Sequence, residues 1–129
     1  MAQKRSILVV DDEIGPRESL RMILKPIYDV HTAADGLEAL QFIAKQRVDL
    51  VTLDLNMPGL SGIEVLRAIK KMNPNIEVIV ITGYGTEKNI QEASRYGATH
   101  ILCKPYNVPE VITIVNQSVD RLNESLKSN

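Results

Sequence analysis

Residues 49–66, DLVTLDLNMPGLSGIEVL, contain the most informative signals for the fold. Leu50–Leu53 form a short, mostly apolar run, which is typical of a strand buried on both faces. Asp54 follows at the end of that run. Ser61 then stands three residues before Glu64, a pattern that begins helices because side-chain oxygens cap the free backbone amides. A buried strand, a polar strand end and a capped helix in succession predict one βα unit.

The same succession recurs along the whole chain. Four further β-rich runs are Ile7–Val10, Tyr28–Ala33, Ile76–Thr82 and His100–Cys103. Between the runs, apolar residues share helical faces: Leu20, Ile23 and Leu24; Leu37, Leu40 and Ile43; Ile63, Leu66 and Ile69. Expected helix caps are Asp35 and Asn107, and expected stops are Pro26, Asn73-Pro74 and Gly97. The alternation predicts a single-domain α/β fold, (βα)₅, whose doubly wound parallel sheet has the flavodoxin-like strand order 2-1-3-4-5.

Bulk composition excludes several classes of protein. A chain of 129 residues fits one hydrophobic core, and a formal net charge of −1 argues against direct nucleic-acid binding. No apolar run approaches the roughly 20 residues that span a bilayer, so no membrane association is expected. Cys103 is the only cysteine, which suits a reducing, cytoplasmic location, and we expect it to be a small buried strand residue.

Polar residues follow the predicted strands where each one ends. Asp11 and Asp12 follow the first strand, Asp54 the third, Thr82 closes the fourth and Lys104 follows the fifth. In the 2-1-3-4-5 order, strands one and three are neighbours at the switch point where ligands bind. Crowded carboxylates need a cation or raised pKa values, and oxygen ligands suit Mg²⁺, with Mn²⁺ as an alternative. The set predicts phosphoryl transfer with Asp54 as the nucleophile.

Four motifs in order resemble the receiver domains of two-component response regulators. They are ILVVDDE (7–13), DLVTLDLNMPGLSGIEVL (49–66), VIVITGYG (78–85) and GATHILCKPY (97–106), and the resemblance runs from about residue 6 to residue 121. It implies that Asp54 is the phosphoacceptor, that Asp11 and Asp12 help to bind Mg²⁺, and that the backbone carbonyl of Asn56 completes the metal shell. It also implies that Lys104 pairs with the phosphoryl group.

The resemblance carries further expectations. Thr82 matches the switch hydroxyl, and Asn56 and Tyr84 match positions that tune the lifetime of the phosphoryl group. The peptide bond before Pro105 is expected to be cis. Ile101 departs from the family, which often has an aromatic switch residue there, so a ring flip is not available. The implied donor is a sensor histidine kinase or a histidine phosphotransfer protein, and the domain catalyses only its own phosphorylation and dephosphorylation.

The C-terminal residues suggest a link to something larger. We expect residues 1–121 to form the receiver and residues 122–129 to extend its last helix, because apolar spacing continues through Val119, Leu122 and Leu126. The extension could lead to an output domain in a longer regulator, or it could support a homodimer.

Three other functions compete with the receiver. A haloacid dehalogenase-like phosphohydrolase would typically carry a second aspartate where this chain has Asn56. A degenerate receiver, used only as a binding scaffold, would normally have lost one of the site residues. A flavodoxin-like cofactor binder would meet too acidic a crevice. Arg17 and Arg21 could help a kinase to dock, although a solvated helix face is the simpler expectation.

Overall fold

The computed structural model describes residues 4–83 and 87–127, with the side chains of residues 87 and 125–127 outside the description. Strands and helices alternate in the order β1 (Ser6–Val10), α1 (Ile14–Leu24), β2 (Asp29–Ala33), α2 (Gly36–Lys45), β3 (Leu50–Asp54), α3 (Gly62–Met72), β4 (Glu77–Thr82), α4 (Glu87–Arg95), β5 (His100–Cys103) and α5 (Val108–Lys127). All pairings are parallel, and the strand order is β2-β1-β3-β4-β5. The predicted fold class and order are confirmed.

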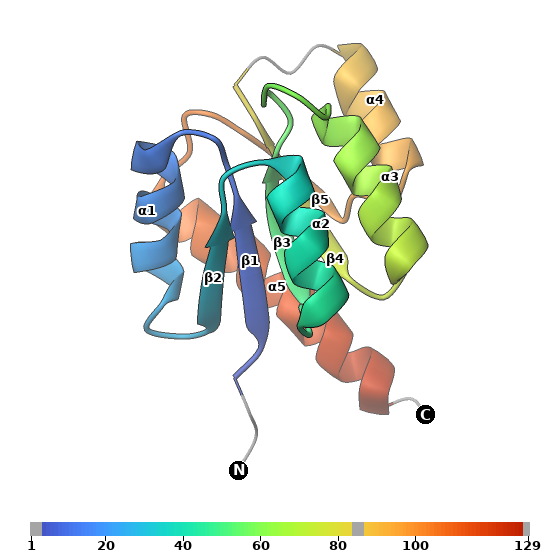
Figure 1. The fold of residues 1–129 in the computed structure, drawn as a ribbon. Helices are drawn as coiled ribbons and strands as arrows, with labels where there is room; N and C mark the ends of the chain where they lie inside the picture. The colour runs from blue at the N-terminus through green and yellow to red at the C-terminus, as the bar shows by residue number, and fades with distance from the viewer. Residues whose placement is uncertain (1–3, 84–86, 128–129) are drawn as a thin grey trace.

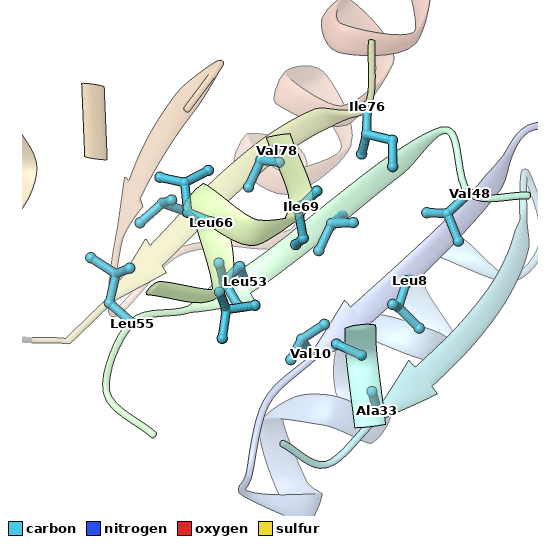
Figure 2. Packing of buried hydrophobic residues seen from close by; sticks show 14 of the residues in the cluster. Leu8, Val10, Ala33, Val48, Leu53, Leu55, Leu66, Ile69, Ile76 and Val78 are labelled. Carbon is cyan, nitrogen blue, oxygen red and sulfur yellow. The ribbon is translucent and has the colours of Figure 1, made fainter. Parts of the chain in front are cut away.

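Helices cover both faces of the sheet, as Figure 1 shows. On one face, Leu20 and Leu24 of α1 and Val111, Val115 and Val119 of α5 pack on the sheet. On the other face, α2, α3 and α4 pack on a second cluster that includes Leu8, Val51, Leu53 and Val78. Figure 2 shows Leu66 and Ile69 of α3 lying over this second face of the sheet. The central strands β1, β3 and β4 are mostly apolar because helices cover both of their faces.

The predicted helix starts are confirmed by their hydrogen bonds. The side chains of Asp35 and Ser61 accept from the backbone amides three residues on, at 2.8 and 3.2 Å. Asn107 and Glu110 form a reciprocal box, in which each side chain accepts from the other residue's amide, at 2.8 and 3.2 Å. Local side-chain chemistry therefore fixes where α2, α3 and α5 begin.

One residue of a predicted apolar helix face is exposed, and one burial prediction was wrong. Leu37 is 60% exposed. In the first turn of α2, Gly36 is the residue that packs closely against Val65 of α3. Leu37, the next residue, therefore turns outward. Cys103 is exposed rather than buried, because it ends β5, which is an edge strand. Strand limits also shift slightly: Tyr28 and Ile76 are buried but precede the strands to which they were assigned.

No helix in the described part of the chain combines the length and the apolar character needed to cross a lipid bilayer.

Candidate functional site

The carboxyl ends of β1 and β3 bring three carboxylates together. Val10 of β1 lies in register with Leu53 of β3, so Asp11 and Asp54, one residue further along, are neighbours. Asp11, Asp12 and Asp54 each offer a carboxylate oxygen within 4.8 Å of the other two. Asp11 and Asp54 are each only 3% exposed, whereas Asp12 is exposed. The cluster therefore opens to solvent on the Asp12 side.

Asp54 is held at the centre by bonds to both of its carboxylate oxygens. Oδ1 accepts a hydrogen bond from the Asn56 backbone amide at 2.8 Å. Oδ2 accepts one from the Lys104 ammonium at 3.1 Å. Charge-assisted bonds of this kind are stronger than neutral ones, so the Asp54 carboxylate is oriented and stays beside the Lys104 ammonium.

Lys104 reaches the site from the end of β5. Its Nζ lies 3.1 Å from Asp54 Oδ2 and 3.6 Å from Asp11 Oδ2. Partial burial opposes the charged form, but the hydrogen bond and the charges of Asp54, with those of Asp11 and Glu13, outweigh it and raise the pKa of Lys104. Its amide donates to the Thr82 carbonyl at 2.9 Å, and the Lys104–Pro105 peptide bond is cis, as the resemblance implied.

Asp11 experiences an excess of negative charge. Burial is the largest influence and raises the pKa of its carboxyl group, the Glu13 amide lowers it, and the Asp54 and Asp12 charges raise it further. Lys104 offsets only part of this effect, so the pKa of Asp11 stays above its ordinary value. A group of anions that one ammonium does not neutralise is suited to bind a further cation.

The donor set fits Mg²⁺. This ion takes oxygen ligands at about 2.1 Å, so two oxygens on opposite sides of it lie about 4.2 Å apart. The carboxylate oxygens of the cluster, within 4.8 Å of one another, come close to that spacing. Asp12, being exposed, leaves an open side for the waters and phosphate oxygens that Mg²⁺ usually retains.

Thr82 has a hydroxyl group that lacks a partner. The residue is fully buried at the end of β4, and its Oγ1 has no hydrogen-bond partner within the described residues. A buried, unsatisfied hydroxyl is costly, so an incoming anionic oxygen would find a ready donor there. Thr82 is tied to Lys104 through the backbone bond between them.

The remaining predicted residues occupy varied positions. Asn56 is exposed beside Asp54, and Ile101 is partly buried against the α2–α4 face of the sheet. Tyr84 lies outside the described residues.

Two neighbours of the site were not predicted from the sequence: Arg17, whose guanidinium donates to the Asp11 carbonyl at 3.0 Å, and Tyr106. The pKa of Tyr106 is raised by burial, with smaller influences from Lys104, Asp11 and Asp54, so its ring lies near the site.

Arg17 was expected on a solvated helix face, but it folds back toward the site. The spacing of six residues from Asp11, in the first turn of a helix that begins at Ile14, was the available signal. The signal is weak, because a long side chain at that distance can equally extend into water.

Comparison with known proteins agrees with this geometry. The family model described as "Response regulator receiver domain" matches residues 7–116. The chain belongs to the response regulator receiver domain family, a class of signalling switches of two-component systems whose general function is phosphorylation on an aspartate.

Individual relatives differ in length. Sporulation initiation phosphotransferase F of Bacillus subtilis is 42% identical over 106 residues, covering 81% of this chain and 86% of that protein. Chemotaxis protein CheY of Thermotoga maritima is 32% identical over 115 residues, covering 88% and 96%. Transcriptional regulatory protein ZraR of Klebsiella oxytoca is 36% identical over 122 residues, which are 92% of this chain but 28% of ZraR. The chain thus covers most of the length of some relatives and less than a third of the length of others.

Solved structures show the same fold. A CheY-like response regulator receiver domain protein from Methanospirillum hungatei superimposes with a TM-score of 0.93 at 27% identity, covering 95% of this chain and 99% of that one. A receiver domain protein from Clostridium thermocellum gives a TM-score of 0.84 at 34% identity, covering 91% and 95%.

Proposed function

We propose that Asp54 is the phosphoacceptor of this receiver domain. The observation that carries the proposal is the convergence on its carboxylate: an amide holds Oδ1, an ammonium holds Oδ2, and two further carboxylates lie beside it. The carboxylate is oriented before any donor arrives, so little reorganisation is needed during the reaction.

The proposed metal is Mg²⁺, with Mn²⁺ as a substitute, held by Asp11, Asp12, Asp54 and the backbone carbonyl of Asn56. The bound ion would neutralise charge on the transferring phosphoryl group and help to position it. The raised pKa of Asp11, caused first by burial, supports this assignment because a cation would relieve the crowding.

The proposed reaction needs few other groups. An Asp54 oxygen attacks the phosphorus, the P–N bond to a donor histidine breaks, and the electron pair of that bond leaves on the imidazole, which takes up a proton. Lys104 then pairs with one phosphoryl oxygen, and the unpartnered Thr82 hydroxyl donates to another. In dephosphorylation, water attacks the phosphorus, the bond to Asp54 breaks and inorganic phosphate leaves.

On this proposal the domain is a switch rather than an enzyme with a separate substrate, because it catalyses only its own phosphorylation and dephosphorylation. Asn56 and Tyr84 would tune the lifetime of the acyl phosphate. Ile101, in register with Val80, would couple Thr82 to the outer strand by packing rather than by a ring flip. The family membership supports the switch role of the domain, whereas the role of Ile101 rests on its packing alone.

The proposed partners are a sensor histidine kinase or a histidine phosphotransfer protein in the cytoplasm. We also propose that residues 1–121 are the receiver and residues 122–129 a helical extension that leads to an output domain or supports a homodimer. Helix α5, which continues to Lys127, supports an extension. Leu126, on which part of this prediction depends, has a side chain outside the description.

The test is an intact-mass measurement after incubation with Mg²⁺ and acetyl phosphate, with phosphate release followed in the same tubes. One added phosphoryl group, absent in Asp54→Ala and after chelation of the metal, is the expected result. Release of phosphate that depends on Asp54, without a lasting adduct, would indicate a short-lived acyl phosphate. Neither adduct nor release would contradict the proposal and favour a binding scaffold.

A further inference from the structure

Asp11 is fixed by four of its atoms, and one of the bonds comes from α1. Its amide donates to the Ala33 carbonyl at 3.2 Å, and its Oδ1 accepts from the Glu13 amide at 2.9 Å. Its Oδ2 lies 3.6 Å from Lys104 Nζ. Its carbonyl accepts from Nη1 of Arg17 at 3.0 Å. Of these four contacts, only the Arg17 bond joins Asp11 to a side chain of α1.

The Asp11 carbonyl belongs to the peptide plane that joins Asp11 to Asp12. A peptide unit is planar, so a bond to its oxygen sets the orientation of the whole plane and the position of the next Cα atom. Within the described residues, no hydrogen bond reaches the carboxylate of Asp12, which is exposed. The backbone is therefore what places this carboxylate in the cluster, and Arg17 holds that backbone.

The bond between Arg17 and the Asp11 carbonyl also closes the turn at the start of α1. Glu13, the N-cap residue, has an extended backbone and makes no side-chain capping bond. The turn before the helix is closed instead by Asp11, which accepts from the Glu13 amide, and by Arg17, which reaches back from the first turn. Arg17 also continues the helix, since its amide donates to the Glu13 carbonyl at 3.1 Å. The acidic turn and α1 thus form one unit.

We propose that Arg17 is a positioning residue, whose bond to the Asp11 carbonyl orients the Asp11–Asp12 peptide and thereby sets the affinity of the cluster for Mg²⁺. The inference rests on the proposed Mg²⁺ site. Partners of this kind, which hold ligands without touching the metal, typically change metal affinity by about 10- to 100-fold when removed.

Charge and geometry predict opposite results for the removal of Arg17. A guanidinium repels a cation, so loss of its charge alone would tighten Mg²⁺ binding. Loss of the bond to the carbonyl frees the peptide plane and would weaken binding. In the structure the guanidinium bonds to the Asp11 carbonyl at 3.0 Å, so we expect the loss of this bond to dominate and Mg²⁺ binding to weaken.

The experiment measures the Mg²⁺ dissociation constant by calorimetry on the metal-free chain and on the variants Arg17→Met and Arg17→Lys. Arg17→Met removes the charge and all donors but keeps an unbranched stem, and it should weaken binding about tenfold. Arg17→Lys, which keeps the charge and one set of donors, should recover part of the loss. Arg21→Met is the matched control, because Arg21 lies one turn further along α1 and pairs with Glu18 at 3.0 Å, and its dissociation constant should be unchanged.

Two further measurements separate positioning from a general loss of structure. The free energy of unfolding of the metal-free Arg17→Met variant should match that of Arg21→Met, and its rate of phosphorylation by acetyl phosphate should return to within about twofold of the unaltered rate at saturating Mg²⁺. If Arg17→Met does not fold, Arg17→Gln, too short to reach the carbonyl, takes its place.

A dissociation constant that is unchanged or lower without Arg17 would overturn the positioning role while leaving the metal site intact. Absence of Mg²⁺ binding by the unaltered chain would overturn the proposed site and the role of Arg17 with it. The two failures are therefore distinguishable in one series of titrations.

Discussion

Replacing Asp11 with asparagine should make the metal-free protein more stable and its response to Mg²⁺ weaker. Asp11 is 3% exposed, and its Oδ1 accepts from the Glu13 amide at 2.9 Å. Asparagine has nearly the same shape and keeps an acceptor for that amide. The substitution therefore removes the charge and little else.

The expected gain follows from the distances around the carboxylate. At an effective dielectric constant of about 20, two carboxylate oxygens 4.8 Å apart repel by about 3 kcal/mol, and Asp11 has two such neighbours in Asp12 and Asp54. Its attraction to Lys104 across 3.6 Å offsets about 5 kcal/mol of this repulsion. The repulsions exceed the attraction by about 1–2 kcal/mol, and because water screens the charge of exposed Asp12, we expect the variant to gain about 1 kcal/mol.

The raised pKa of Asp11 also determines in which direction the stability difference changes with pH. Burial, followed by nearby negative charge, raises the pKa of Asp11 above its ordinary value of 3.8, so the folded state binds this proton more tightly than the unfolded state. The contribution of Asp11 to the stability of the unaltered protein therefore falls as pH rises from 3.8 through the raised pKa. The asparagine variant lacks this loss, so the difference in the free energy of unfolding between the two proteins is small at acid pH and reaches its full size at neutral pH.

The assay is urea denaturation followed by circular dichroism, with and without Mg²⁺. The ion at about 100 times its dissociation constant stabilises the unaltered protein by about 2.7 kcal/mol, and the variant should gain much less. Arg21→Met is again a suitable control, because it lies on the same side of the fold but outside the acidic cluster. A variant that is less stable than the unaltered protein at neutral pH, or that gains equally from Mg²⁺, would refute the reasoning.

Three further substitutions test the packing, each by the free energy of unfolding. Thr52→Val should stabilise by about 1 kcal/mol, because Thr52 Oγ1 is buried without a partner in the described structure; a loss of stability would mean that the hydroxyl is satisfied. Gly62→Ala should destabilise by about 1–3 kcal/mol, since the new Cβ would lie 2.5 Å from Cα of Leu55, whereas its control, Gly15→Ala, meets nothing within 4 Å and should be neutral or stabilising. Leu37→Gln should change stability by less than about 0.5 kcal/mol, and a larger loss would contradict the 60% exposure of Leu37.

Much of the fold was legible in local patterns. The strand runs were predicted to within one or two residues, because the central strands, which are covered on both faces, are mostly apolar. The starts of α2, α3 and α5 were predicted because Asp35, Ser61 and Asn107 cap amides only three residues away. These signals act over a few bonds and do not depend on the rest of the molecule.

The errors arose where the outcome depended on distant neighbours. Leu37 has the spacing of a core residue, yet the approach of Gly36 to Val65 turns it outward. Cys103 continues an apolar strand, yet it ends an edge strand and stays exposed. Periodicity shows that a helix or strand has an apolar face, but not which of its residues a neighbouring element will reach.

Local sequence patterns were enough to predict the alternation of strands and helices and the kinds of side chain that follow the strands. How these side chains meet depends on contacts between distant parts of the chain. The register of Val10 with Leu53 makes Asp11 and Asp54 neighbours, and the approach of β5 brings Lys104 to within 3.1 Å of Asp54. Arg17 joins the site through a bond to a backbone carbonyl, a group that every residue carries, so no pattern of side chains could single it out.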